Sequence, residues 1–187
     1  MVAKVINVIK DDLNQTFDEV FSWFNVGNSL LQFSPNNKGW NIGKILEHIF
    51  LTNHYLLILI RKGAEKAIAE SRKHDFAEQL QNYDLDWERM KAIGNHKSFE
   101  WSRPEHMEPR GRMSMDDIQS KLQSQLNECL TYLHQMQHGE GALYKTMMTV
   151  NGLGKIDVYH YIYFLVQHAR RHLAQMEKVE LEYNLGV

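Results

Sequence analysis

Proline is scarce in this chain. Only three of its 187 residues are proline, namely Pro35, Pro104 and Pro109. Proline inside an α-helix removes a backbone hydrogen bond and clashes with the preceding turn, so its scarcity favours long uninterrupted helices. All three prolines fall in stretches without a helical pattern, where we expect connections. A few long helices should therefore make up most of the molecule.

Apolar residues recur every three or four positions in four long segments. This spacing gives an α-helix one apolar face, which we call its seam. The predicted helices span about residues 2–24, 41–69, 114–137 and 156–181. Asn41 is a good N-cap for the second helix, and Ser114 followed by Asp117 is close to a capping box for the third. No segment shows sustained two-residue alternation, so no strand is expected. The prediction is an all-α four-helix bundle, with residues 1–187 as a single domain and a long crossover connection between the second and third helices.

The connections are harder to interpret. Residues 70–113 show no clear pattern beyond a candidate short helix at 76–83, and their role stays unassigned. Residues 139–154 are rich in glycine and read as a loop, with a candidate helical turn at 144–150.

Composition narrows the class of protein. Hydrophobic residues make up 43% of the chain and charged residues 24%, as in globular proteins, and the net charge of −2 argues against nucleic acid as the main partner. The longest apolar run, Tyr55–Ile60, is too short for a membrane span, and no signal peptide is apparent. A single cysteine excludes an internal disulfide and a cysteine-based zinc site. We expect a cytoplasmic protein without a membrane or nucleic-acid partner.

Two pairs of histidines have the spacing i, i+4, which places both imidazoles on one helix face. His168 and His172 stand on the apolar seam of the fourth helix, where burial is unfavourable unless each imidazole has a partner. His134 and His138 fall off the seam, at the end of the third helix, where a hydrogen-bonding or cationic side chain complements the helix terminus. The first pair is therefore a candidate for metal binding, whereas the second is expected to be solvated and to bind no metal.

A metal site needs a third ligand, and His48 is the other histidine on a seam, near the start of the second helix. The pattern leaves two interpretations open. His48, His168 and His172 either bind one metal ion or are separate hydrogen-bonded core histidines. Because three imidazoles leave a coordination position open, a metal bound there would be of the catalytic rather than the structural kind.

Several neighbours of these histidines are candidates for supporting roles. Gln175, one turn beyond His172, either hydrogen-bonds a ligand or substrate or is a polar core residue. Tyr55 and Tyr161, on the seams that carry the histidines, either contact substrate or fill the core. Glu47 points about 100° away from His48 around the helix, so we expect a surface or supporting residue rather than a general base.

Cys129 lies on the seam of the third helix between Leu126 and Leu133. A cysteine in such a position behaves as a small apolar core residue. We therefore do not expect it to act as a nucleophile, and the nucleophile of any reaction would have to be a co-substrate or water.

Three segments resemble those of DinB-like proteins. The segment at 40–49, WNIGKILEHI, resembles the start of the family's second helix, where a tryptophan and a small capping residue precede a metal-binding histidine. The segment at 167–175, QHARRHLAQ, resembles the last-helix motif His-x-x-x-His-x-x-Gln, and residues 102–117 resemble the lead into the third helix. The resemblance implies an up-down-down-up bundle in which His48, His168 and His172 bind a divalent metal, usually zinc or nickel.

The resemblance also implies a function. Relatives include thiol-dependent S-transferases that use bacillithiol or mycothiol, and a mycothiol-dependent maleylpyruvate isomerase. The expected partners are thus a low-molecular-weight thiol and a small electrophile. Three arginines of the connection either bind a carboxylate of the thiol or are solvated loop residues, namely Arg103, Arg110 and Arg112. A metal-dependent hydrolase and a non-enzymatic metal-binding bundle are the alternatives. A homodimer is expected because the second helix is apolar on nearly every side and the family often dimerises.

Overall fold

The computed structural model describes residues 1–36, 39–95, 98 and 104–186. The α-helices in these ranges are α1 (Val2–Ser22), α2 (Asn28–Gln32), α3 (Ile42–Ser71), α4 (Trp87–Gly94), α5 (Met115–Gln135) and α6 (Val158–Leu185). Single 3-10 turns are η1 (Trp23–Asn25), η2 (Glu78–Leu80), η3 (Glu105–Met107), η4 (Glu140–Leu143) and η5 (Val150–Gly152), and the two strands are β1 (Lys145–Met148) and β2 (Gly154–Asp157).

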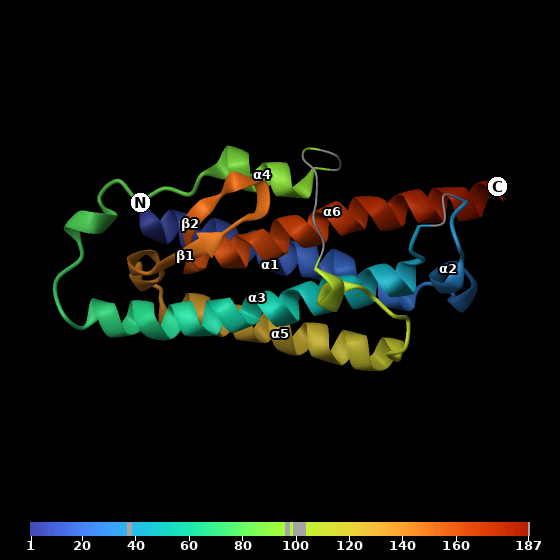
Figure 1. Cartoon of the computed structure of the whole chain (residues 1–187), viewed down its shortest axis with the longest axis horizontal. Helices are drawn as coiled ribbons and strands as arrows, with labels where there is room; N and C mark the ends of the chain where they lie inside the picture. The colour runs from blue at the N-terminus through green and yellow to red at the C-terminus, as the bar shows by residue number, and fades with distance from the viewer. Residues whose placement is uncertain (37–38, 96–97, 99–103, 187) are drawn as a thin grey trace.

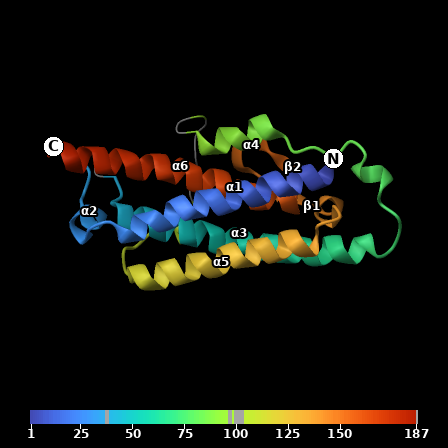
Figure 2. The ribbon, with the colours of Figure 1, turned by 180° about the vertical axis from the view of Figure 1, so that it is seen from behind.

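The long helices α1, α3, α5 and α6 lie side by side, and the predicted helical bundle is confirmed (Figures 1 and 2). Helix α3 packs against α5 and α6, and α1 packs against the same two helices. In Figure 1, α1 and α6 run from left to right whereas α3 and α5 run from right to left. The antiparallel pair α3 and α6 matters for function because these helices carry the candidate site.

The long helices begin at residues that cap them. The side chain of Asn41 accepts a hydrogen bond from the Lys44 amide at 2.9 Å, as expected for the N-cap of α3. Ser114 Oγ accepts from the Asp117 amide at 3.1 Å at the start of α5. Asp157 caps α6 in the same way, through the amide of His160 at 3.1 Å. These caps set where α3 and α6 start and hence which of their residues face each other.

Helix α6 is the central helix of the molecule. Its first half is almost wholly buried, including Tyr159, Tyr161, Tyr163 and Phe164, because α1, α3, α4 and the strands surround it (Figures 1 and 2). Arg170 ties it to α1 through a salt bridge of 2.8 Å with Asp12. This packing holds α6 in a fixed position against α3.

The connection between α3 and α5 differs from expectation. The predicted helix at 76–83 is wrong, since only the turn η2 forms there, and the true helix of this region is α4. Its start is capped by Asp86, which accepts from the Arg89 amide at 3.2 Å, and Met90 and Ile93 bury its apolar side. Gly94 allows close packing on α6, because a Cβ at this position would lie 2.6 Å from Gln167 Oε1. The short helix α2 is also absent from the sequence-based prediction.

The predicted helical turn at 144–150 is wrong, as is the expectation of no strands. Strands β1 and β2 form an antiparallel hairpin in which Met148 pairs with Gly154. Four-residue strands are too short to show the alternation that reveals longer strands. At the hairpin end, Gly152 and Gly154 have φ values of 60° and 73°, which glycine adopts without strain.

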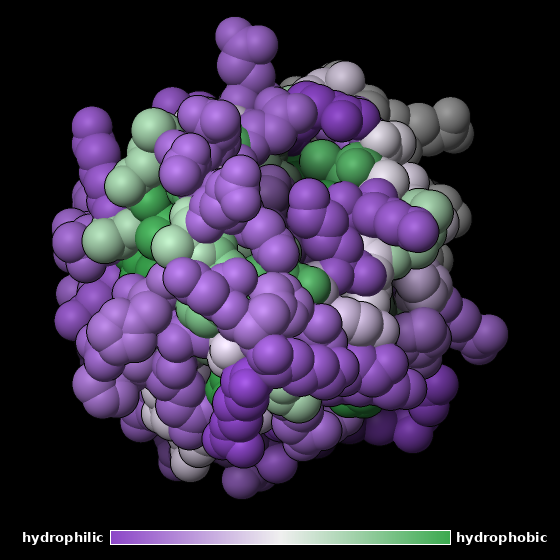
Figure 3. All heavy atoms as spheres, turned by 90° about the vertical axis from the view of Figure 1, so that its left-hand side faces the viewer, coloured by the Kyte–Doolittle hydropathy of each residue, from purple (hydrophilic) through white to green (hydrophobic). Residues whose placement is uncertain are grey.

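The end of the bundle seen from the left of Figure 1 has a mostly hydrophilic surface with small separate apolar areas (Figure 3). Within the described ranges, no helix combines the length and the apolar character needed to cross a membrane.

Candidate metal centre

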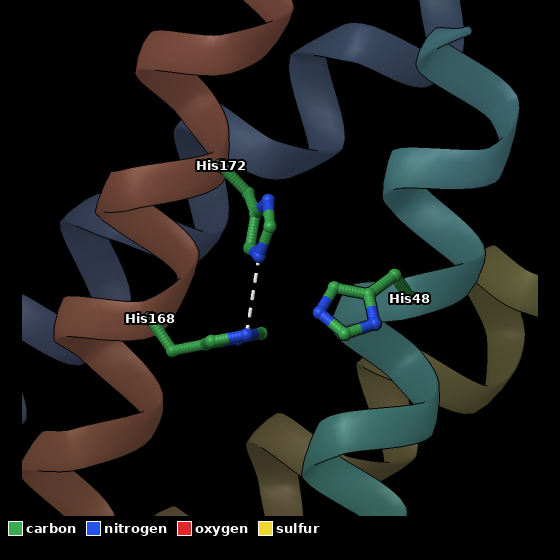
Figure 4. Close-up of side chains that lie close together, drawn as sticks. All are labelled: His48, His168 and His172. Atoms are coloured by element: carbon green, nitrogen blue, oxygen red, sulfur yellow. Dashed lines mark hydrogen bonds between the residues drawn. The ribbon is translucent and has the colours of Figure 1, made fainter. Parts of the chain in front are cut away.

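Three histidines meet between α3 and α6. His48 comes from α3, and His168 and His172 lie one turn apart on α6, so that all three rings point toward one another (Figure 4). One nitrogen from each ring can be chosen so that the three atoms lie within 4.8 Å of one another, and all three residues are buried. In the part of the chain that the structure describes, no fourth histidine, cysteine or carboxylate joins this group.

His48 is held by the crossover connection. Its Nδ1 donates a hydrogen bond to the carbonyl oxygen of Met107, in η3, at 2.8 Å. With the proton assigned to Nδ1, the lone pair of the neutral ring is on Nε2. The indole of Trp40 packs on the same imidazole, with ring centroids 4.8 Å apart. The His48 ring is therefore fixed in both tautomer and orientation.

His172 is oriented in a similar way by its own helix. Its Nδ1 donates to Oε1 of Gln175 at 2.9 Å, which leaves Nε2 as the acceptor of the neutral ring. That Nε2 lies 3.1 Å from Nε2 of His168 (Figure 4). Two imidazoles bound to one zinc ion at about 2.0–2.1 Å would have their nitrogens roughly 3.0–3.4 Å apart. A metal ion could therefore replace the proton that joins these two rings, with little movement of α6.

His168 is kept neutral by its surroundings. Burial, the neighbouring rings of His172 and His48, and the cation of Arg171 lower its pKa well below the usual value for histidine. Metal ions bind the neutral form of imidazole. The electrostatics of the site thus favour the protonation state that a metal requires, and the three-histidine donor set fits a divalent ion.

The histidines line a cavity of about 670 Å³, a volume typical of small-molecule sites. Its apolar lining comes from several elements and includes Trp40, Leu56, Met107, Met148, Val150 and Phe164. Its polar lining includes Thr52, Arg171, Gln175, Lys178 and Glu182. A site with three imidazoles beside a cavity of this size has room for a further ligand.

Arg171 is the cation nearest to the histidines along α6. Its Nη1 donates to the carbonyl oxygen of Asn95, the residue that follows α4, so α4 holds its guanidinium at the cavity wall. Neither Arg110 nor Arg112 lines the cavity, and both are exposed. Arg103 lies outside the described residues. Among the arginines, the structure thus brings Arg171 to the site rather than the two described candidates.

The two tyrosines proposed from the sequence lie outside the cavity lining. Tyr161 is buried, and its hydroxyl donates to the carbonyl oxygen of Met147 at 3.0 Å, so it joins α6 to the hairpin. Tyr55 is half-buried and packs on the ring of His106, with centroids 4.2 Å apart. Gln175, by contrast, lines the cavity and contacts His172.

Glu47 is not a surface residue, and that part of the expectation is wrong. It is only 4% exposed, and its Oε2 accepts a hydrogen bond from the Gly111 amide at 2.5 Å. The carboxylate therefore anchors the crossover connection to α3, on a different side of the helix from the cavity. Glu47 is adjacent in sequence to His48, and this anchor helps to hold η3 over the histidine.

Cys129 and the second histidine pair lie where the sequence analysis expected them. Cys129 is 1% exposed, and burial raises its pKa to about 12, so the thiolate does not form near neutral pH. His134 and His138 are exposed at the end of α5 and are not members of the three-histidine group.

Sequence reasoning missed the Met107 carbonyl, Arg171 and the hairpin residues of the cavity wall. The carbonyl is a backbone group, which every residue has, so the sequence does not indicate its role. Arg171 lies within the recognised 167–175 motif, and its position between His168 and His172 was a usable signal. The hairpin contributes Met148 and Val150, and its glycines were read as loop only.

Comparison with known proteins shows the family of the chain. Residues 11–176 match the family model of the DinB superfamily. Neither the curated proteins nor the solved structures gave a significant match. The matched region includes His48, His168, His172 and Gln175 and covers most of the chain. On this match, the protein is a member of the DinB superfamily.

Proposed function

We propose that the protein is a divalent-metal-dependent enzyme that transfers a low-molecular-weight thiol to a small electrophile. The observation that carries the proposal is the convergence of three buried histidines at the wall of a 670 Å³ cavity. His48, His168 and His172 would hold the metal, with zinc or nickel as the expected ion. A bound divalent ion supplies a Lewis acid that lowers the pKa of a thiol or water at the open position.

The residues around the histidines have separate tasks in this proposal. The Met107 carbonyl and Gln175 hold the rings of His48 and His172 in the orientation that binding needs. The cavity lining carries two cationic residues, Arg171 and Lys178, against one acidic residue, Glu182, and this balance favours a hydrophilic, anionic thiol. The apolar lining excludes water that would compete with the thiol.

The transfer is a substitution in which the thiol supplies the nucleophile. The sulfur forms a bond to the electrophilic carbon, the leaving group departs with the bonding electron pair, and the thiol proton passes to solvent. Cys129 cannot supply the sulfur, because it is buried and protonated. A cytoplasmic location is part of the proposal, since low-molecular-weight thiols stay reduced there.

The geometry favours an enzyme over a purely metal-storing bundle, since three ligands rather than four are available among the described residues and a cavity adjoins them. The test starts with metal analysis of the purified protein. Bacillithiol, mycothiol, glutathione and coenzyme A are then assayed with 1-chloro-2,4-dinitrobenzene as a generic electrophile. Thiol-dependent turnover that is lost with the metal supports the proposal. Failure of all four thiols to react or bind would favour the hydrolase or the non-enzymatic alternative, and ester hydrolysis by the same protein would select the former.

We also propose a homodimer. Helix α3 keeps two large apolar side chains at the surface, Ile58 at 47% exposure and Leu59 at 38%. A dimer at micromolar concentration in light scattering is expected, with Ile58→Asp shifting it toward monomer. The control is Glu177→Gln, an exposed substitution on α6. A monomeric wild-type protein would rule the dimer out.

A further inference from the structure

The residues that line the cavity differ in polarity between the two sides of the histidines. Along α6, Phe164 precedes His168 by one turn, whereas Gln175, Lys178 and Glu182 follow His172. Because α3 runs antiparallel to α6, its Leu56 lies on the Phe164 side, two turns beyond His48 (Figure 1). One side of the site is thus mainly apolar, whereas the other side carries the charged residues Lys178 and Glu182 beside the apolar Val179.

The hairpin lies on the Phe164 side, because Tyr161 near the start of α6 holds Met147 of β1 (Figure 1). Four apolar residues of the cavity lining are therefore on this side, and we call them the apolar chamber: Leu56, Phe164, Met148 and Val150. Leu56, Met148 and Phe164 are between 2% and 8% exposed although they line the cavity. The chamber is close to the metal ligands, because the ring centroids of Phe164 and His168 are 6.4 Å apart and the rings are stacked. A small group held there would lie within one side-chain length of the histidines.

The chamber wall is held in place by contacts outside the cavity. The hydroxyl of Tyr161 donates to the Met147 carbonyl at 3.0 Å and fixes β1 to α6. Arg89 of α4 donates to the Gly152 carbonyl at 2.5 Å and fixes the hairpin end. Along β1, Met147 is 60% exposed while Met148 is 7% exposed and faces the cavity. The wall is therefore preformed, and adjacent methionines provide a matched test pair.

We propose that the apolar chamber binds an apolar alkyl or aryl group of the electrophilic substrate and that the hairpin thereby sets substrate specificity. The role of the bound molecule as an electrophile rests on the thiol transfer proposed above, whereas the binding of an apolar group does not. The hydrophilic body of the thiol lies on the other side of the histidines, toward Gln175 and Lys178. The two substrates thus approach the metal site from opposite directions along α6.

The first experiment needs neither metal nor turnover. Toluene is titrated into the full-length protein carrying ¹³C-labelled methionine methyl groups, and the NMR spectrum is recorded before and after metal loading. Toluene is expected to shift the Met148 methyl signal and to leave that of Met147 in place. Met148→Asp is expected to weaken toluene binding at least tenfold, and Met147→Asp less than twofold. Val150→Asp, in the half-buried hairpin end, repeats the test should Met148→Asp fail to fold.

The second experiment connects the chamber to the metal. A series of alkyl hydroxamates from acetyl to hexanoyl is titrated into the cobalt-loaded protein and followed by its visible spectrum. Each added methylene is expected to tighten binding about three- to fourfold while the chamber fills. The gain should disappear in Met148→Asp and persist in Met147→Asp.

The outcomes separate the two proposals. An unshifted Met148 signal, or equal toluene affinity in Met148→Asp and wild type, would overturn the chamber whatever the metal does. Hydroxamate affinity that does not change with chain length would also overturn it. Failure to bind cobalt or to turn over thiols would instead overturn the proposed function, with the toluene titration still deciding whether the chamber binds apolar groups.

Discussion

Nδ1 of His172 lies 2.9 Å from Oε1 of Gln175, three residues further along the same helix. A glutamine in this position stabilises one tautomer and one rotamer of the ring. Partners of metal-binding histidines typically contribute a 10–100-fold increase in affinity. Gln175→Ala is therefore expected to lower metal affinity at least about tenfold without unfolding the bundle. Competition with a chromophoric chelator measures the change.

Gln175→Glu is the informative companion, because a carboxylate still accepts the hydrogen bond from Nδ1. It is expected to retain tight metal binding. Glu177→Gln, at an exposed position of α6, serves as the control. Equal affinities for Gln175→Ala and wild type would show that the glutamine has no part in holding the site.

The two histidine pairs are expected to respond differently to substitution. His168→Ala should remove stoichiometric metal and any metal-dependent turnover, because it deletes one of the three converging imidazoles. The double variant His134→Gln, His138→Gln should keep both, because these side chains are exposed at the end of α5. Inductively coupled plasma mass spectrometry of the purified variants gives the stoichiometry. Metal loss from the His134/His138 variant would contradict the assignment.

The stability of the metal-free protein should depend on pH through His168. Its pKa is lowered well below that of an ordinary histidine, mainly by burial, so the unfolded state binds a proton at higher pH than the folded state. The free energy of unfolding is therefore expected to fall as the pH drops below about 6.5 and to keep falling until the lowered pKa is reached. Urea titrations at pH 7.5 and 5.5 measure the difference. His168→Gln should show a smaller decrease over the same interval, and an unchanged decrease would exclude His168 as its cause.

Cys129 should be inert in the folded protein. Burial raises its pKa to about 12, and its side chain packs within the core. Ellman's reagent at pH 8 is expected to label it only after denaturant is added, and Cys129→Ala should retain thiol transfer. Rapid labelling of the native protein would mean that α5 opens far more readily than its burial indicates.

Helical periodicity was enough to predict the long helices and the metal-site candidates. His48, His168 and His172 occupy positions where the periodicity predicts apolar side chains. Burying an imidazole without a hydrogen-bonding or metal partner is unfavourable in free energy. The same reasoning distinguished His134 and His138 from the metal-site candidates, because they lie outside the apolar face of their helix. Asn41 and Ser114 marked the starts of α3 and α5 through their capping chemistry.

Other features depend on tertiary contacts that a single sequence does not encode locally. Helix α4 is short, and the packing of Met90 and Ile93 on α6 stabilises it more than its own periodicity does. The hairpin is stabilised by pairing across a glycine-containing turn and by the Tyr161 hydroxyl. The burial of Glu47 follows from the path of the crossover, which brings the Gly111 amide to its carboxylate.

The hydrogen-bond acceptor that holds Nδ1 of His48 is a backbone carbonyl oxygen, that of Met107. Any amino acid at position 107 can supply that oxygen, provided that the crossover keeps its length and course. The side chains around η3 are therefore free to change with the substrate while the support for the histidine persists. Substitutions in this segment should reshape the cavity without loss of metal, whereas insertions or deletions should affect both. The crossover is thus a place where an engineer can alter selectivity and leave the metal chemistry intact.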